Sequence, residues 1–285
     1  MKLIIFLLLM VVLFVGCSAT NITQETNELK KVALVIGNKN YKNKALINPI
    51  NDAKGISDIL KKMGFEVLLK TDLTQKGFDR ALNEFKKKID HNSILFFYFA
   101  GHANTLQRNS SEEFLAMIEE GRKKTIISLY RLYSFLREVP SRYNIVVIDA
   151  CRNYQKHSKV LFTNQRGIYR GDFDFDSGQL MRGEVLIDNN YSANFPRSTL
   201  VSYATMHNQI ANDKSKKDDT HSPYTRALIE HLDDEEIPIE EVFKRIRGDM
   251  IDELGGEQIN LEESSLEKNI WLQPKRGAIP ISTPF

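Results

Sequence analysis

This sequence of 285 residues has few cysteines and tryptophans and almost no excess of one charge. It has two cysteines and one tryptophan, and 39 basic residues nearly balance 37 acidic ones, which leaves a formal net charge of +2. This balance gives no global field for binding nucleic acid, so no nucleic-acid partner is expected. Hydrophobic residues make up 42% and charged residues 27%, close to globular averages. The composition therefore excludes a mainly disordered or multi-span membrane chain and predicts a packed domain.

The one long hydrophobic run lies at residues 3–15, between Lys2 and Gly16-Cys17. A run of this length is too short to cross a bilayer comfortably, so it predicts a signal peptide over residues 1–17. Gly16-Cys17 resembles the lipobox of bacterial lipoproteins, which implies cleavage before Cys17 and acylation of its thiol. We therefore expect an exported bacterial lipoprotein, anchored to a membrane on the periplasmic side or at the cell surface. The alternatives, an ordinary signal peptide or an uncleaved anchor, would also export the domain.

Residues 18–29 are polar and lack periodicity, which predicts a flexible tether before a domain over residues 30–274. In that domain, continuous apolar runs alternate with segments whose apolar residues recur at helical spacing. The alternation predicts an α/β fold with a mostly parallel central sheet and helices on both faces. Strands are expected at residues 32–36, 65–69, 94–99, 145–148, 199–203 and 270–272, and helices at residues 53–63, 74–89, 128–136, 222–232 and 238–246.

The regular pattern lapses between Asn153 and Pro196, where Gly, Asp, Asn and Arg accumulate. A stretch of this length without a clear element is usually functional or mobile in a compact domain. It divides the domain into a large part (residues 30–153), an irregular linker (154–196) and a small part (197–274), followed by a tail (275–285).

Two reactive side chains follow the third and fourth predicted strands. His102 comes after one and Cys151 after the other, and both fall at the edge where parallel strands end. Cys151 is the one cysteine outside the leader, so it has no internal disulfide partner. If the strands are neighbours, His102 can take the proton of Cys151 and activate it as a nucleophile. The pattern alone equally allows a buried packing cysteine and a hydrogen-bonded loop histidine.

The backbone N–H groups of Ala103 and Cys151 lie in the loops that follow the third and fourth predicted strands. They are candidates for holding the oxyanion of a tetrahedral intermediate.

Two segments carry a family resemblance: FYFAGH at residues 97–102 and VIDACRN at residues 147–153. They resemble the catalytic segments of the caspase-like cysteine peptidases, particularly the bacterial relatives of metacaspases, and the resemblance extends over residues 31–272. It implies a caspase-like fold with large and small subunit-like parts in one chain. It also implies that Cys151 is the nucleophile and His102 the general base and acid.

The charge next to the thiol indicates a substrate class. Asp149 disfavours a thiolate at Cys151, so it is a poor activator of the thiol. Asp149 and Asp52 together would instead suit the guanidinium or ammonium of a substrate side chain. The resemblance to metacaspases implies that these two positions line an acidic S1 pocket selecting Arg or Lys. The alternatives are a helix N-terminal acid at Asp52 and a strand-end turn former at Asp149.

The irregular linker contains Arg166, Arg170 and Arg182, which are candidate self-cleavage sites if the specificity is basic. Ordinary arginines of a solvated loop are the alternative. The histidines show no metal-ligand spacing, so we expect no structural metal and no cofactor. The sequence leaves open whether Ca²⁺ activates the protein.

These features predict a cysteine endopeptidase that acts on proteins or peptides after Arg or Lys. One rival is a catalytically weak or inactive scaffold at the membrane. Two features favour it: the irregular linker, and Ala103 at a position where the family usually has Gly. Another rival is an esterase or transferase that uses the same thiol.

Overall fold

The computed structural model describes residues 29–42, 44–107, 111–120, 123–152, 154–155, 168–173, 180–186, 194–207 and 209–273, which belong to the unit Leu29–Ala278. Its elements, in chain order, are β1 (Lys30–Gly37), α2 (Pro49–Lys62), β2 (Glu66–Thr71), α3 (Gln75–Lys86), β3 (Ser93–Ala100), β4 (Ala103–Gln107), β5 (Ser111–Glu120), β6 (Lys123–Ser128), α4 (Leu129–Glu138), β7 (Tyr143–Asp149), β8 (Tyr154–Gln155), β9 (Ile168–Phe173), β10 (Leu180–Leu186), β11 (Thr199–Tyr203), α5 (Pro223–His231), α6 (Ile239–Leu254) and β12 (Leu261–Ser264).

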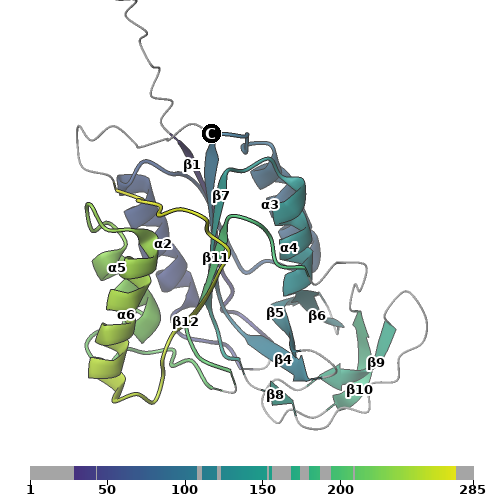
Figure 1. Cartoon of the computed structure of the whole chain (residues 1–285). Coiled ribbons are helices and arrows are strands. Elements are labelled where there is room, and N and C mark those ends of the chain that lie inside the picture. Colours follow the sequence, from purple (N-terminus) through teal and green to yellow (C-terminus); the bar gives the residue numbers. More distant parts are fainter. Residues whose placement is uncertain are drawn as a thin grey trace, which may run out of the picture. The chain divides into compact units, whose positions relative to one another are not determined.

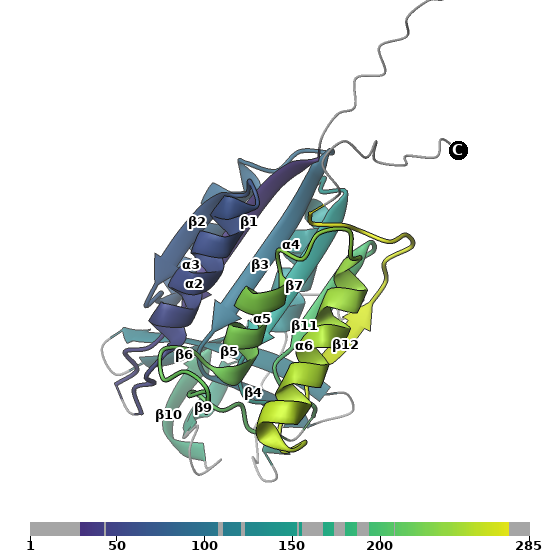
Figure 2. The same cartoon turned by 90° about the vertical axis from the view of Figure 1, so that its left-hand side faces the viewer.

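A central sheet organises this unit, with strand order β12-β11-β7-β3-β1-β2 (Figures 1 and 2). β1, β2, β3, β7 and β11 pair in parallel, and β12 is antiparallel to β11. Every residue of β3 is buried, as expected for a strand covered on both faces. The predicted α/β fold with a mostly parallel sheet is therefore confirmed.

Helices cover both faces of the sheet: α2, α5 and α6 lie on one face and α3 and α4 on the other (Figure 1). Alternate residues of β1 feed the two cores. Ala33 and Val35 pack into the cluster with α2, and Val32 and Leu34 pack into the cluster with α3. This period of two is the reason why a continuous apolar run forms a strand between two helical layers.

Side-chain caps start three of the helices. Thr74 Oγ1 accepts a hydrogen bond from the Gly77 N–H at 3.3 Å, and Ser222 Oγ accepts one from the Thr225 N–H at 2.9 Å. Ser128 caps α4 in the same manner. These oxygens satisfy N–H groups that have no partner within the first turn, so the predicted helix starts at Thr74, Ser128 and Ser222 are confirmed.

The turn from β1 toward α2 requires glycine. A Cβ atom on Gly37 would lie 2.2 Å from the carbonyl oxygen of Pro49 and 2.8 Å from Cβ of Ala53. We expect Gly37→Ala to lower the free energy of unfolding by about 1–3 kcal/mol, because β1 and α2 must separate to admit the methyl group. Urea denaturation measures this. Gly248→Ala, where a Cβ meets no atom within 4 Å in α6, is the control and should not destabilise the protein.

The sheet formed by β6-β5-β4-β8 was not predicted. Three of its strands, β4, β5 and β6, lie between His102 and α4 in the chain, and the fourth, β8, follows Cys151. The linker predicted to be irregular also contains the antiparallel pair β9 and β10. The strand predicted at residues 270–272 is wrong, since Trp271 forms only an isolated bridge with Pro238. Ile270 and Leu272 are apolar because they are buried in the core, and the edge strand is the more polar β12.

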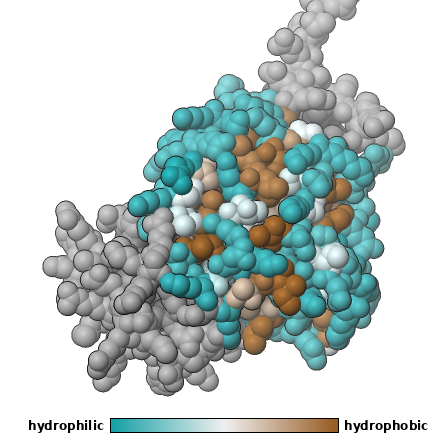
Figure 3. Space-filling model, turned by 180° about the vertical axis from the view of Figure 1, so that it is seen from behind, coloured by the Kyte–Doolittle hydropathy of each residue, from teal (hydrophilic) through white to brown (hydrophobic). Residues whose placement is uncertain are grey.

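The surface of the described residues has both hydrophobic and hydrophilic side chains. On the face seen from behind, hydrophobic residues form patches separated by hydrophilic ones (Figure 3). In the described part of the chain, no helix combines the length and the apolar character needed to cross a membrane.

Candidate active site

A cavity of about 290 Å³ opens where β3 and β7 end. The two strands pair in register with Ala100 opposite Asp149, so His102 and Cys151 lie equally far beyond paired residues. Both line the cavity, as do Asp52, Asp149 and Asp213 among others. Its volume is near the lower end for ligand pockets and suits a single side chain of a larger substrate.

A backbone carbonyl orients the imidazole of His102. Its Nε2 lies 2.9 Å from the carbonyl oxygen of Lys44. Because a carbonyl only accepts, Nε2 carries the proton and donates, which makes Nδ1 the basic nitrogen. Lys44 has φ +59°, a left-handed conformation that is costly for a residue with a side chain and that is often found at functional sites. Burial lowers the pKa of His102, so the imidazole is neutral at pH 7.

Tyr41 contacts both the backbone and the ring of His102. The His102 N–H donates to the Tyr41 hydroxyl at 3.0 Å, and that hydroxyl donates to the Ala116 carbonyl at 3.1 Å. The two ring centroids are 4.6 Å apart. Gly101 allows this approach, since a Cβ there would lie 2.5 Å from the hydroxyl oxygen. Tyr41 therefore links His102 to β5.

We expect Tyr41→Phe to lower kcat about tenfold with little change in KM, because the two hydrogen bonds that join the His102 backbone N–H to the Ala116 carbonyl through the hydroxyl are lost. Steady-state kinetics on a peptide substrate measure this. Tyr143→Phe, at the opposite end of β7, is the matched control. An unchanged kcat in the Tyr41 variant would show that the hydroxyl does not position His102.

Cys151 is held as a neutral thiol. The Ala211 N–H points at its Sγ atom at 3.4 Å. Burial raises the pKa of Cys151, and the charges of Asp149 and Asp213 raise it further. The pKa shifts of the thiol and of the imidazole thus both disfavour a resting ion pair. Nucleophilic attack by Cys151 requires transfer of its proton to a base.

Arg152 anchors the chain directly after the thiol. Its guanidinium is buried, lies 3.7 Å from the centroid of the Tyr203 ring, and forms an ion pair with Glu113 of β5. The Arg152 N–H also donates to the Gln209 carbonyl at 3.1 Å. These contacts join the loop that carries Cys151 to β5, β11 and the loop after β11.

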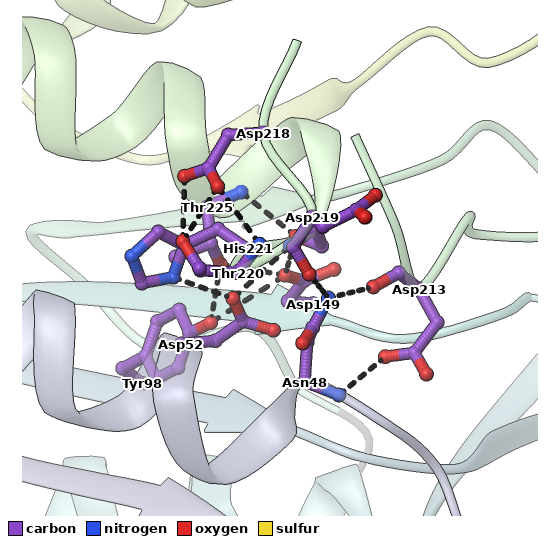
Figure 4. A network of polar contacts seen from close by, with 11 residues as sticks. Asn48, Asp52, Tyr98, Asp149, Asp213, Asp218, Asp219, Thr220, His221 and Thr225 are labelled. Atoms are coloured by element: carbon purple, nitrogen blue, oxygen red, sulfur yellow. Dashed lines mark hydrogen bonds and ion pairs between the residues drawn. The ribbon is translucent and has the colours of Figure 1, made fainter. Parts of the chain in front are cut away.

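Two buried carboxylates, Asp52 and Asp149, line the cavity. Figure 4 shows both within a network of polar contacts. Asp149 Oδ2 accepts hydrogen bonds from the hydroxyls of Ser222 at 2.5 Å and Thr225 at 2.6 Å. Asp52 Oδ1 accepts one from the Ser222 N–H at 3.1 Å. Burial is the largest cause of their pKa shifts, raising the pKa of Asp52 to about 7 and that of Asp149 to about 6.

Asp213 adds a third carboxylate that the sequence analysis missed. It lines the same cavity and accepts hydrogen bonds from the backbone N–H groups of Ile47 at 2.5 Å and Asn48 at 3.1 Å. Asn48 also donates from its side chain to the Asp213 carbonyl at 2.6 Å. These bonds tie the loop after β11 to the start of α2. Lys44 is the one lysine or arginine among the described residues that line the cavity, so the charge there favours a cation.

A family model of the caspase domain matches residues 30–271, which is most of the chain. The chain belongs to the caspase domain family. The members of this family are cysteine peptidases, which accounts for a thiol and an imidazole in one cavity.

Two further comparisons agree with this assignment. The crystal structure of Caspase-1 from Spodoptera frugiperda superposes with a TM-score of 0.59 over 89% of this chain and 94% of that one. At 12% identity it shows the fold alone. Human and mouse mucosa-associated lymphoid tissue lymphoma translocation protein 1 are each 26% identical over 135 residues. The matched stretch is 46% of this chain but only 16% of each relative.

The caspase domain brings the predicted site residues together. His102, Ala103, Cys151, Asp52 and Asp149 all line the same cavity, although the sequence separates Asp52 and Cys151 by about a hundred positions. Their catalytic and binding roles are still predictions.

Two of the other predicted sites, Cys17 and Arg166, are outside the described residues. Arg170 and Arg182 belong to the paired strands β9 and β10. Within the described residues, no three His, Cys, Asp or Glu side chains are grouped so as to hold a metal ion.

Proposed function

We propose that this caspase domain is an active endopeptidase that cleaves peptide bonds after Arg or Lys. The observation that carries the proposal is the convergence of three carboxylates on the cavity that also contains His102 and Cys151. A basic side chain entering this cavity would exchange water for charged acceptors, whereas an aspartate would meet like charges.

The chemistry follows from the protonation states of the resting pair. His102 Nδ1 takes the proton of the Cys151 thiol as its sulfur attacks the substrate carbonyl carbon. The backbone N–H groups of Ala103 and Cys151 stabilise the oxyanion. The imidazolium then donates its proton to the leaving amine, and the C–N bond breaks to leave a thioester. Water, deprotonated by His102, hydrolyses the thioester and restores the thiol.

Cleavage-site mapping tests the proposed specificity. The domain from residue 27 onward is incubated with a peptide library that contains every residue type, and the new C-termini are identified by mass spectrometry. Arg or Lys is expected at these C-termini, and none should form with Cys151→Ala. New C-termini ending mainly in Asp, or in no preferred residue, would contradict the assignment of the acidic pocket.

The pH dependence of KM follows from the two buried carboxylates. Asp52 and Asp149 line one cavity, and burial raises the pKa of Asp52 to about 7 and that of Asp149 to about 6. A raised carboxyl pKa means that the anion exists above these values and is lost as the pH falls through them. The KM for an Arg peptide is thus expected to rise as the pH falls from 8 to 5. The KM for an otherwise identical peptide with neutral citrulline should stay nearly flat, and parallel changes in both would contradict the expectation.

We further propose that acylation of Cys17 tethers the domain to a membrane outside the cytoplasm. Substrates would then be exported or extracellular proteins. Labelling with a fatty-acid analogue tests this, because Cys17→Ser should abolish incorporation and Cys151→Ala should not.

A further inference from the structure

His221 contacts Asp52, one of the carboxylates of the acidic pocket, from outside the cavity. Its Nδ1 lies 3.0 Å from Oδ1 of Asp52, in the loop that leads into α5 (Figure 4). The imidazole is mostly buried, with 20% of the side chain exposed, whereas the Asp52 side chain is 2% exposed. His221 is not among the residues that line the cavity, so it reaches the substrate region only through Asp52.

Helix α2 leaves room for this imidazole at Gly55. A Cβ atom there would lie 2.9 Å from Cε1 of His221 and 2.5 Å from Cδ1 of Ile229. Any larger residue at this position of α2 would displace the ring. Asp52 is one turn earlier on the same helix, so α2 supplies both the acceptor and the space for its partner.

The hydrogen bonds of Asp52 converge on one oxygen. The ring of His221 and the N–H of Ser222 both lie against Oδ1. Among the described residues, Oδ2 of Asp52 accepts no hydrogen bond. Asp149 shows the same asymmetry, because its hydroxyl partners all contact Oδ2. Each carboxylate thus has one anchored oxygen and one oxygen left for a ligand.

We propose that His221 is a positioning residue that keeps Asp52 ionised and directs its second oxygen at the basic side chain of the substrate. This inference rests on the proposed Arg or Lys specificity. His221 would thereby set the pH above which the pocket discriminates a cation from a neutral side chain of the same shape.

The charges around His221 favour its protonated form. Asp52 on α2, Asp218 in its own loop and Asp149 at the end of β7 all act on the imidazole, and the hydrogen bond to Asp52 is the largest cause of its raised pKa. Arg226 of α5 is engaged in ion pairs with two glutamates. Burial raises the pKa of the Asp52 carboxyl, and the hydrogen bond from His221 lowers it. A protonated His221 therefore stabilises the Asp52 anion.

The test compares Arg and citrulline peptides, which differ in charge but hardly in shape. The ratio of their kcat/KM values between pH 5 and 9 cancels the ionisation of the dyad and reports the charge of the pocket. We expect His221→Ala to raise the midpoint of this ratio by about one pH unit and to lower the ratio at pH 6.5 about tenfold. His221→Asn keeps a neutral donor at the position of Nδ1. The His221→Asn variant should therefore show the wild-type ratio at high pH, but its midpoint should stay as high as that of His221→Ala.

His231→Asn is the matched control, because His231 is 19% exposed and also contacts aspartates, but away from the cavity. It should leave the midpoint unchanged. Thermal unfolding and turnover of the citrulline peptide verify that each variant is folded. A wild-type midpoint in both His221 variants would overturn the inference while leaving the specificity intact. A higher ratio at low pH in His221→Ala would also overturn it, since His221 would then be a competing cation. No preference of the wild type for Arg at any pH would overturn the proposed specificity and the inference with it.

Discussion

Replacement of His102 with alanine is expected to lower kcat/KM on an Arg peptide by about 10³–10⁴-fold. Burial and the charges of Asp149 and Asp213 raise the pKa of Cys151, so few molecules contain a thiolate at pH 7 without a base. The neutral imidazole held by Lys44 supplies that base. Steady-state kinetics at pH 7 measure the loss, and His91→Ala, on an exposed turn, is the control.

Alkylation by iodoacetamide separates this role from a structural one. The wild-type thiol should react with a rate that falls as His102 becomes protonated at low pH. The His102→Ala variant should react slowly at pH 7 and regain its rate only at high pH, where hydroxide removes the proton. A variant that keeps more than a tenth of the peptidase activity would contradict the assigned role of the imidazole.

Substitution of Asp149 by asparagine is expected to remove the preference for a basic side chain. Truncating one partner of a buried charge pair costs about 2–5 kcal/mol, so kcat/KM for an Arg peptide should fall at least about 30-fold. Asparagine can still accept hydrogen bonds from Ser222 and Thr225, which preserves the local structure. The kcat/KM for the citrulline peptide should change little. Asp58→Asn, on the exposed side of α2, provides the control.

The same substitution should make the thiol more reactive. Asp149 raises the pKa of Cys151, so its neutralisation lowers that pKa and speeds alkylation at pH 7. Loss of Arg turnover together with faster alkylation would locate the defect in the pocket. Slower alkylation would instead mean that the substitution disturbs the dyad.

The strands of the central sheet were predictable because burial on both faces leaves a continuous apolar run. The run predicted at residues 94–99 became β3, and the run at residues 145–148 became β7. The smaller sheet lacks this signal, since β5 mixes apolar residues with several glutamates. Residues 270–272 were mistaken for a strand because burial in a core without strand pairing produces the same apolar pattern.

The candidate site was predictable where a side chain carries the chemistry. His102 and Cys151 follow buried strands, and a family resemblance indicated Asp52 and Asp149. Lys44 contributes a main-chain carbonyl, which any residue type could supply, so its identity gives no signal.

Asp213 lies in a polar loop and reaches the pocket through contacts with Asn48, 165 positions earlier. Tyr41 likewise meets His102 only in the fold. No local pattern encodes such long-range contacts.

The central claim is tested most directly by the hydrolysis of two fluorogenic peptides that differ only in ending with Arg or Asp. The domain from residue 27 onward and its Cys151→Ala variant are assayed at pH 8, with and without Ca²⁺. We predict turnover of the Arg peptide alone, abolished in the variant. Turnover of the Asp peptide, or Arg turnover that survives in the variant, would contradict a basic-specific peptidase that uses this thiol.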